Sequence, residues 1–341
     1  MYRAVYEGDR RLSVIDVPET APGPGQVQID VAFTGICGTD LHILHGAMDR
    51  RVAVPAVIGH EMSGTVARLG DGVDGWKPGD PVTVLPVLPC GACRTCAAGH
   101  GHVCPRLTFI GIDSAGSMQQ RWNVPASALV RLPETLHLAH GALAEPTAVA
   151  VHDVRRSGLT SGEHAGVVGG GPVGLLIAVV ARRTGAQVLV LEPSPQRRAV
   201  ADRLGFATAD PTAADTNALI EDWTGGEGAA VSFEVSGAAA GVATAVQALA
   251  PRGRLVMVAI HATAREVDLH RFFWRELTML GARLYSRQDM ADAVELVAGG
   301  QIPADQLITH VEPLERAGAA FAALESGAGV MKVLLDCAAG R

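Results

Sequence analysis

The sequence contains a group of side chains whose types suit a single metal ion. Cys37 opens the run Cys37-Gly38-Thr39-Asp40, and His60 follows further along in Gly59-His60-Glu61. Thiolate, imidazole and carboxylate are all zinc ligands, and a catalytic zinc usually has three protein ligands and one exchangeable position. Cys37 and His60 therefore predict an open zinc site.

Two glutamates are candidates for the third ligand. Glu61 follows His60 directly, and Glu145, in Ala144-Glu145-Pro146, lies at the start of an expected helix. Adjacent side chains on a strand point to opposite faces, so His60 and Glu61 can share a metal only where the backbone is irregular. Both glutamates are kept as candidates. The alternative is that Glu61 is an ordinary strand-end carboxylate and His60 a core imidazole.

Three further polar residues lie close to Cys37 in the sequence. Asp40 is expected to accept the second N–H of the metal-bound imidazole, as carboxylates near zinc often do, although a turn aspartate is the alternative. The Thr39 hydroxyl and the His42 imidazole could pass a proton from the substrate to solvent. His42 as a plain surface residue remains the other interpretation.

Four cysteines form a second, denser group. Cys90, Cys93 and Cys96 are each three apart, and Cys104 follows after a glycine-containing stretch. Four thiolates at such spacing can surround zinc tetrahedrally without an open position, which defines a structural site. An iron–sulfur cluster can use similar spacing. The metal site predicted upstream favours zinc for both groups, about two ions per chain.

A glycine-rich turn follows an apolar strand. Gly169-Gly170-Gly171-Pro172-Val173-Gly174 matches G-x-G-x-x-G and precedes an apolar helix over Leu175 to Ala181. In this context the glycines allow a tight turn and a close approach of the backbone to a pyrophosphate at the helix N-terminus. The pattern predicts a dinucleotide site.

The end of the next strand indicates which dinucleotide is bound. Glu192 ends the strand Gln187–Leu191, where a carboxylate binds the ribose diol and repels a 2′-phosphate, so NAD is favoured over NADP. Arg197 and Arg198 keep NADP as an alternative, because either could reach a phosphate. A solvated helix face is the more common place for such arginines.

The elements that carry these residues change character along the chain. The first third alternates short apolar runs with Pro/Gly turns and predicts a β-rich domain. From about Glu145 onward strands alternate with long helices, which predicts a parallel sheet covered on both faces. The strands are expected at 165–168, 187–191, 230–234 and 254–259. The tail is expected to add helices over 291–297 and 315–325 and a strand over 332–335 that pairs with the first domain.

Composition limits the class of protein and its partners. The 341 residues are 48% hydrophobic, enough for about two domains with cores of their own. A net charge of −7 disfavours nucleic acids and anionic membranes, so small molecules are the expected partners. No signal peptide is visible and the cysteines are grouped as metal ligands, which predicts a reducing, cytoplasmic location. The apolar run 165–181 approaches the length of a membrane span, but its glycines and proline favour a strand, a turn and a helix.

Taken together, these motifs resemble the zinc-dependent medium-chain alcohol dehydrogenase family. The run from Gly59-His60-Glu61 to Val73 is similar to its zinc signature, Cys90 to Cys104 to its structural zinc lobe, and Gly169 to Gly174 to its cofactor turn. The resemblance implies an α/β plus β-rich fold: a Rossmann doubly wound parallel sheet inserted into a GroES-like catalytic domain, with the active site between them. The implied boundaries are 1–146 for the catalytic domain, with the lobe at about 88–106, 147–286 for the Rossmann domain, and 287–341 for the return.

Within this family the sequence is most similar to the polyol, 2,3-butanediol and threonine dehydrogenases. In that branch Glu145 takes the place of a second cysteine ligand, and the glutamate of Gly-His-Glu binds zinc directly or through water. The resemblance also implies cofactor contacts, at Val173, Glu192, Arg197, Val258, Ala259, Ile260 and Tyr285. Leu284 stands where sorbitol dehydrogenases typically have arginine, which favours a smaller diol or another sugar-like alcohol.

The expected activity is hydride transfer between a secondary alcohol and NAD(P). Zinc would lower the pKa of the substrate hydroxyl, and Thr39 and His42 would carry the proton away. A non-catalytic redox sensor that binds the dinucleotide, or a zinc-free quinone or enone reductase of the same fold, is the alternative. A sheet edge near Thr278 to Ala282 predicts a homo-oligomer, either a dimer or a tetramer, and the tetramer is suggested by the resemblance alone.

Overall fold

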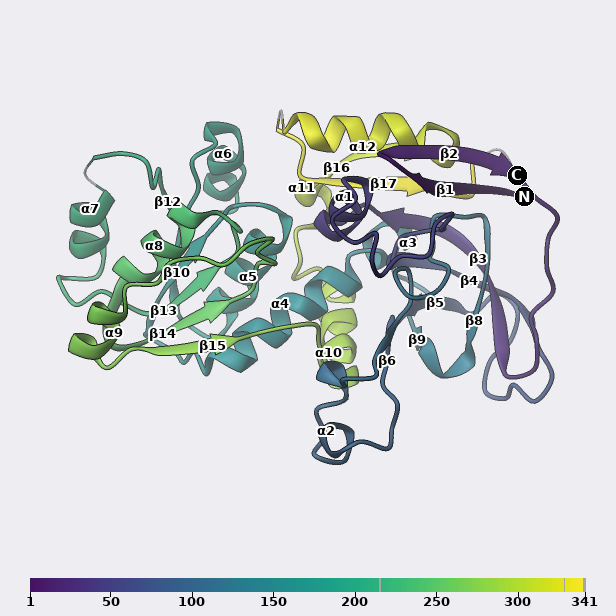
Figure 1. Cartoon of the computed structure of the whole chain (residues 1–341), viewed down its shortest axis with the longest axis horizontal. Helices are drawn as coiled ribbons and strands as arrows, with labels where there is room; N and C mark the ends of the chain where they lie inside the picture. Colours follow the sequence, from purple (N-terminus) through teal and green to yellow (C-terminus); the bar gives the residue numbers. More distant parts are fainter. Residues whose placement is uncertain (215, 328, 340–341) are drawn as a thin grey trace. The chain divides into compact units, whose positions relative to one another are not determined.

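The chain forms two compact units. The computed structural model describes residues 1–214, 216–327 and 329–339. The first unit comprises Met1–Ala148 and Tyr285–Arg341, and the second comprises Val149–Leu284 (Figure 1). The chain leaves the first unit within one helix, α4 (Ala144–Ser157).

The first unit is built around a sheet of seven strands. Their order is β16-β17-β3-β4-β5-β9, with β8 paired to β3. The last strand of the chain, β17, pairs antiparallel with β3, so the C-terminal segment completes the sheet that the N-terminal segment begins. The bounds are β3 (Gln26–Gly35), β4 (Glu61–Leu69), β5 (Pro81–Val84), β8 (Arg121–Pro125), β9 (Leu129–Arg131), β16 (Ile308–Pro313) and β17 (Lys332–Asp336).

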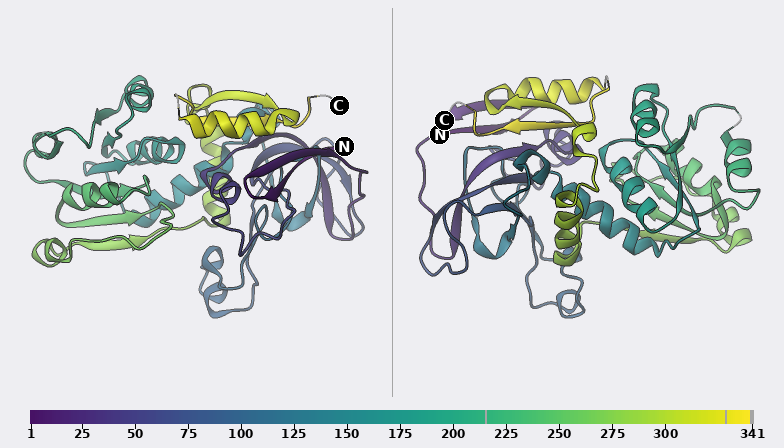
Figure 2. Two further views of the ribbon diagram at one scale, coloured as in Figure 1. Left: turned by 45° about the horizontal axis from the view of Figure 1, so that its top comes forward. Right: turned by 180° about the vertical axis from the view of Figure 1, so that it is seen from behind.

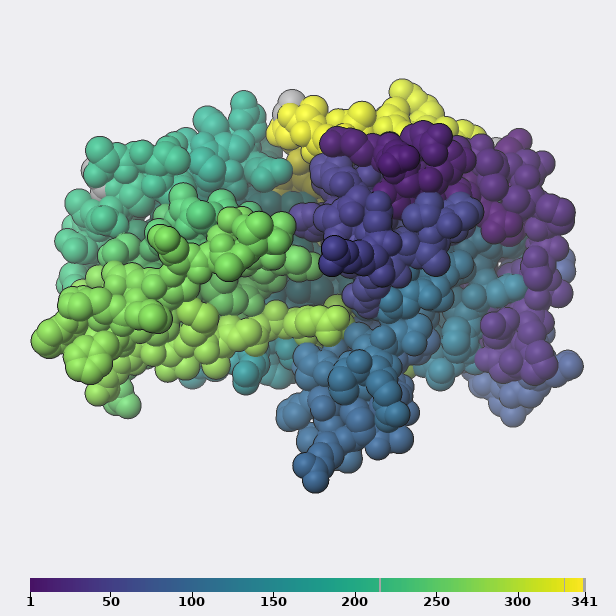
Figure 3. Space-filling model, viewed as in Figure 1, coloured from purple at the N-terminus to yellow at the C-terminus, as the bar shows by residue number. Residues whose placement is uncertain are grey.

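Smaller elements surround this sheet. Helix α12 contacts the hairpin of β1 and β2, and both lie along one side of the unit (Figure 2). A lobe that carries α2 projects from the unit between β6 and β7 (Figure 3). The bounds are β1 (Tyr2–Gly8), β2 (Arg11–Asp16), β6 (Val87–Leu88), β7 (Thr108–Phe109), α1 (Gly38–Leu44), α2 (Arg94–Ala97), α3 (Leu138–Gly141), α10 (Arg287–Ala298), α11 (Ala304–Leu307), α12 (Ala317–Ser326), η1 (Gly101–Val103), η2 (Ala126–Ala128) and η3 (Leu314–Arg316).

The second unit is a six-stranded parallel sheet with helices between its strands. The order is β12-β11-β10-β13-β14-β15, which confirms the doubly wound arrangement because the chain moves outward from β10 in one direction and from β13 in the other. The bounds are β10 (His164–Val168), β11 (Gln187–Leu191), β12 (Ala207–Ala209), β13 (Ala229–Glu234), β14 (Leu249–Met257), β15 (Thr278–Gly281), α5 (Pro172–Arg183), α6 (Pro195–Arg203), α7 (Thr216–Trp223), α8 (Ala239–Gln247) and α9 (Leu269–Arg275).

The long apolar run in this unit is a strand, a turn and a helix, as expected. Pro172 stands in the first turn of α5, where its missing N–H leaves no helix hydrogen bond unmade. Every residue of α5 from Gly174 to Ala181 is buried, so the apolar composition reflects a helix packed within the core. Within the described part of the chain no helix is both long and apolar enough to cross a membrane.

Some element boundaries differ from the sequence-based expectation. Helix α10 begins at Arg287 rather than near Ala291, because Ser286 and Asp289 form a capping box at its N-terminus. Strand β14 ends at Met257 instead of Ala259. The N–H groups of Val258 and Ala259 both bond to the carbonyl of Glu234, so the chain turns there.

Candidate functional site

Cys37, His60 and Glu61 meet in the first unit. Cys37 is the N-cap residue of α1, and Glu61 is the first residue of β4. One ligand atom from each of the three side chains lies within 4.8 Å of the others. The thiol, imidazole and carboxylate together are a donor set that fits zinc.

A bend at Gly59 lets the adjacent His60 and Glu61 face the same site. Gly59 has φ +100°, and an added Cβ would lie 2.8 Å from Met118 Cγ and 2.9 Å from Ser117 Oγ. His60 thus precedes the regular strand that begins at Glu61. Such an irregular backbone is what allows the adjacent side chains of His60 and Glu61 to approach one metal.

Glu145 lies outside this group of three, but close enough for the charges of His60 and Glu61 to act on its carboxyl group. It lies in the first turn of α4, is 4% exposed, and accepts a 2.6 Å hydrogen bond from the Tyr285 hydroxyl. Burial raises the pKa of Glu145 to about 7, against the opposing effect of the nearby His60. Tyr285, expected among the cofactor contacts, is fully buried with its hydroxyl directed at this glutamate.

Sequence reasoning missed a buried lysine beside Glu61. Lys332 Nζ donates to both carboxylate oxygens, at 2.9 and 2.7 Å, and lies 3.3 Å from the carbonyl of Ile36. Lys332 is 3% exposed and Glu61 1%. The available signal was a lysine inside the apolar run Met331 to Leu335, because an unpaired lysine is rarely buried.

Asp40, Thr39 and His42 all belong to α1. Asp40 is fully buried; one carboxylate oxygen accepts the Cys37 N–H at 2.9 Å, and the other lies 3.8 Å from His60 Nδ1. That distance is too long for a hydrogen bond, so Asp40 faces the imidazole without contacting it. Thr39 and His42 are half-buried and three residues apart, which puts them on one helix face.

The four cysteines of the projecting lobe form the second metal group. Sulfur–sulfur distances are 3.4 Å for Cys93–Cys96, 3.8 Å for Cys93–Cys104 and 4.0 Å for Cys90–Cys96. All four sulfurs lie within 4.8 Å of one another, as a tetrahedral site needs.

Arg106 is a further residue of the lobe that sequence reasoning did not identify. Its side chain donates to Cys90 Sγ at 3.3 Å, and its backbone N–H donates to Cys104 Sγ at 3.3 Å. The pKa of the Cys90 thiol falls to about 6, first through the backbone N–H of Ala92 and also through Arg106. Cys90 is therefore held toward the thiolate that a metal requires, whereas desolvation raises the pKa of the Cys96 thiol to about 11.

The glycine-rich turn of the second unit has the close contacts that a dinucleotide turn needs. Gly169 has φ +110°, and a Cβ at Gly174 would lie 1.9 Å from the carbonyl oxygen of Gly169. Gly171 is the N-cap residue of the twelve-residue α5, followed by Pro172 and Val173. The backbone thus enters the helix with room for a phosphate at its N-terminus.

Glu192 lies beside this turn, and the two arginines differ in their surroundings. Glu192 accepts the backbone N–H groups of Gly170 at 2.7 Å and Ser194 at 2.8 Å. Arg198 donates to the carbonyls of Glu192 and Pro193 and pairs with Asp210 at 3.0 Å. Arg197 is half-buried near Gly171.

The segment after β14 borders the same edge of the sheet. Val258 and Ala259 are half-buried and anchored to the Glu234 carbonyl, whereas Ile260 is 64% exposed.

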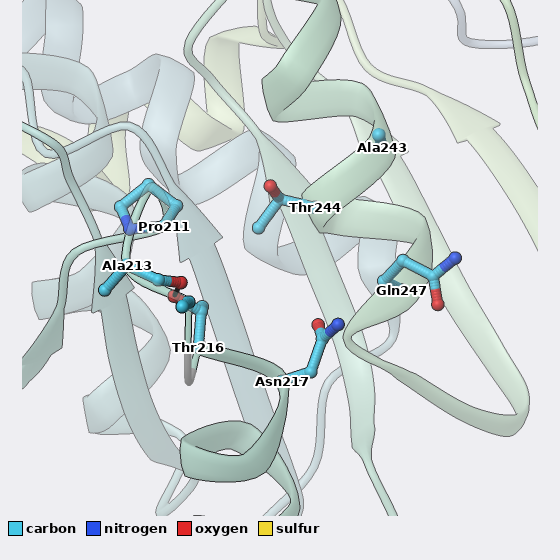
Figure 4. A pocket seen from close by; sticks show the side chains of 8 residues that line it. Pro211, Ala213, Thr216, Asn217, Ala243, Thr244 and Gln247 are labelled. Carbon is cyan, nitrogen blue, oxygen red and sulfur yellow. Dashed lines mark hydrogen bonds between the residues drawn. The ribbon is translucent and has the colours of Figure 1, made fainter.

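A separate pocket of this unit lies between α7 and α8, and none of the predicted site residues lines it (Figure 4).

A parallel sheet with a dinucleotide turn and a Cys/His/Glu metal group define a metal-dependent dehydrogenase. Residues 23–134 match the model of the alcohol dehydrogenase GroES-like domain, and residues 172–299 match that of the zinc-binding dehydrogenases. The chain belongs to the zinc-dependent medium-chain alcohol dehydrogenase family.

Individual relatives cover nearly the whole chain. A 2-dehydro-3-deoxy-L-galactonate 5-dehydrogenase from Pseudoalteromonas atlantica is 48% identical over 99% of both chains. An L-galactonate-5-dehydrogenase from Escherichia coli is 33% identical over 86% of both. The crystal structure of 2R,3R-butanediol dehydrogenase from Bacillus subtilis is 30% identical, covers 98% of this chain and 99% of its own, and has a TM-score of 0.90.

These findings confirm the expected fold, family and reaction class. The chain is an NAD(P)-dependent oxidoreductase of secondary alcohols, and its family binds zinc. They favour this activity over the redox sensor and the zinc-free reductase, because the relatives are dehydrogenases and both metal groups have a complete set of donor atoms.

Proposed function

We propose that the substrate is a sugar acid, oxidised at a secondary hydroxyl or reduced at the corresponding ketone. The similarity to the 2-dehydro-3-deoxy-L-galactonate 5-dehydrogenase carries this proposal, since it extends over 99% of both chains. The second similarity, to an L-galactonate-5-dehydrogenase, supports the same substrate class. This narrows the polyol, diol and sugar-like alcohols expected from sequence to alcohols that carry a carboxylate.

We assign the catalytic zinc to Cys37, His60 and Glu145. Glu61 completes the tighter group, but Lys332 engages both of its oxygens, whereas the Tyr285 hydroxyl bonds to only one oxygen of Glu145. Glu61 then serves as a nearby carboxylate held by Lys332, and Tyr285 positions Glu145. Zinc, when bound, lowers the pKa of a coordinated hydroxyl.

Residues of α1 transfer the substrate proton to solvent in this proposal. Asp40 faces His60 and favours the imidazole orientation, and the Thr39 hydroxyl and His42 pass the substrate proton toward solvent.

Cys90, Cys93, Cys96 and Cys104 hold a second, structural zinc, for about two ions per chain. Because such thiols must stay reduced, the cytoplasm is the proposed location.

We propose NAD rather than NADP as the cofactor. Glu192 stands at the end of β11 beside the glycine turn, where its charge opposes a 2′-phosphate. Arg198 is engaged by two carbonyls and by Asp210, so its charge is already balanced; of the two arginines, Arg197 is the one that lies near the turn at Gly171.

The proposal is tested by one matrix of substrates and cofactors on zinc-replete protein. The substrates are 2-dehydro-3-deoxy sugar acids, aldonates such as L-galactonate, xylitol, 2,3-butanediol and threonine, each with NAD and with NADP. We expect the highest kcat/KM with a sugar acid and NAD. A preference for an uncharged polyol would contradict the substrate class, and a preference for NADP would contradict the role of Glu192. Metal analysis of the same sample should find about two zinc ions per chain.

A further inference from the structure

A buried carboxylate lies in the second unit at the point where the strand order of the parallel sheet changes direction, between β10 and β13. Glu234 is the last residue of β13, which is parallel to β10; the chain continues from β10 to β11 on one side of this pair and from β13 to β14 on the other. In open parallel sheets, ligands bind outside the carboxyl ends of the strands at this point. A Cβ on Gly169 would lie only 2.9 Å from the backbone nitrogen of Ser236, so the segment after Glu234 touches the dinucleotide turn itself.

The Glu234 carboxylate is fully satisfied by groups from two loops. One oxygen accepts the Ser236 N–H at 2.9 Å, the Ser236 hydroxyl at 2.5 Å and the Gly237 N–H at 3.0 Å. The other lies 2.9 Å from His261 Nε2. Glu234 is completely buried, and a buried charge requires such partners. It therefore fastens the turn after β13 to the loop after β14.

The hydrogen bonds of His261 define which nitrogen carries the proton. A carboxylate only accepts, so Nε2–H donates to Glu234, and Nδ1 accepts from Nε of Arg265 at 3.3 Å. The other nitrogens of Arg265 donate to Thr263 Oγ1 at 3.0 Å and to the Gly237 carbonyl at 3.4 Å. Arg265 thus connects the two loops and is not a free cation for a phosphate.

We propose that Glu234, His261 and Arg265 form a clamp that positions the 258–260 segment for the nicotinamide half of the cofactor. This rests on the proposal that Val258, Ala259 and Ile260 contact the cofactor. Glu234 is linked to both sides of that segment: its backbone carbonyl accepts the N–H groups of Val258 and Ala259, and its carboxylate accepts from the side chain of His261, which follows the segment directly. Between them Ile260 exposes an apolar side chain, 64% accessible, that an aromatic ring can cover.

The three residues are positioning residues, not catalytic ones. Holding a contact surface in its binding geometry raises affinity because less conformational freedom is lost on binding. The adenosine half binds at Glu192, whose hydrogen bonds to the backbone of Gly170 and Ser194 do not involve His261 or Arg265. The clamp therefore affects NADH and not ADP-ribose, which lacks the nicotinamide.

The experiment compares NADH and ADP-ribose binding to the zinc-replete protein by calorimetry. The variants are His261→Leu, which removes both hydrogen bonds, His261→Gln, which retains a donor and an acceptor, and Arg265→Leu. Arg203→Leu, on the exposed side of α6, is the matched control. We expect His261→Leu and Arg265→Leu to weaken NADH binding about tenfold, with ADP-ribose affinity within about twofold of wild type, and His261→Gln to recover most of the loss.

Two results would overturn the clamp while leaving the proposed function intact. One is unchanged NADH affinity in His261→Leu. The other is an equal loss of NADH and ADP-ribose affinity, which a general disturbance of the unit would produce. If the wild-type protein bound neither NADH nor NADPH, the proposed function would fail and the clamp with it.

Discussion

At the scale of single residues, the ion pair of Lys332 and Glu61 has the largest predicted effect on stability. Both side chains are at most 3% exposed, and Lys332 Nζ contacts both oxygens of Glu61. Breaking a buried pair leaves one charge without compensation, which destabilises a protein by about 3–5 kcal/mol. We expect Lys332→Met to lower the free energy of unfolding by about that amount, as measured by denaturant titration.

The exposed Lys77 offers the same substitution as a control. Lys77→Met should leave stability within about 0.5 kcal/mol of wild type. The double variant Lys332→Met/Glu61→Gln removes both charges and should recover part of the loss. Equal stability of Lys332→Met and Lys77→Met would show that the pair does not stabilise the fold.

Asp153 on α4 is a second residue with an unusual environment. It is 1% exposed, and neither carboxylate oxygen has a hydrogen-bond partner among the described residues. Burial raises the pKa of Asp153 well above its ordinary value of 3.8. Because the folded state favours the protonated carboxyl group, Asp153 contributes most to the stability of the protein below about pH 4. That contribution is lost as the pH rises through the folded-state pKa.

Asp153→Asn should therefore stabilise the protein at neutral and alkaline pH. Its melting temperature should exceed that of wild type at about pH 8, and the difference should shrink as the pH falls toward 5. Thermal melts across this range provide the measurement, with exposed Asp222→Asn as the control. A pH-independent difference would mean that the ionisation of Asp153 is not its cause.

At the scale of elements, the turn before β4 determines whether His60 and Glu61 can face one metal. A Cβ at Gly59 would clash with Met118 and Ser117, and φ +100° is strained for any other residue. Gly59→Ala should therefore displace His60 and lower both zinc content and turnover. Metal analysis should find about one zinc per chain, because the lobe is a separate site.

Gly72→Ala is the matched control for this turn. Gly72 also has a positive φ, +75°, but an added Cβ would meet no atom within 4 Å. It should lose about 1 kcal/mol of stability from backbone strain while keeping both zinc ions. If both variants bound the same amount of zinc, the close packing at Gly59 would not be what orients His60.

Elements with a strong local pattern could be predicted from sequence, whereas those that depend on tertiary contacts could not. The strand 187–191 is apolar throughout and was predicted with its observed bounds. The three-residue β12, Ala-Thr-Ala, has no comparable pattern and forms because it pairs with β11 at the sheet edge. Similarly, residue types indicated Cys37 and His60, but the ion pair of Glu61 with Lys332 joins positions 271 residues apart.

At the scale of the whole molecule, the exposed apolar surface of α9 predicts self-association. Leu269, Phe273 and Trp274 are 74%, 76% and 68% exposed, and β15, the next element along the chain, is the last strand of its sheet, with one side unpaired among the described residues. Association between chains buries exposed apolar patches and pairs or covers open sheet edges. We propose a homo-oligomer, a dimer or a tetramer, that uses this surface.

Replacing two of these side chains with charges should reduce the oligomer. We expect light scattering with gel filtration to give a mass above the 35.3 kDa of one chain for wild type, and a smaller assembly for Phe273→Glu/Trp274→Glu. Val311→Glu is the control, because Val311 is 49% exposed on β16, the edge strand of the other large sheet. Dissociation by Val311→Glu with an intact Phe273→Glu/Trp274→Glu oligomer would place the interface on β16 instead. If the wild-type protein had the mass of a single chain, the proposed oligomer would be excluded, whether through α9 and β15 or through β16.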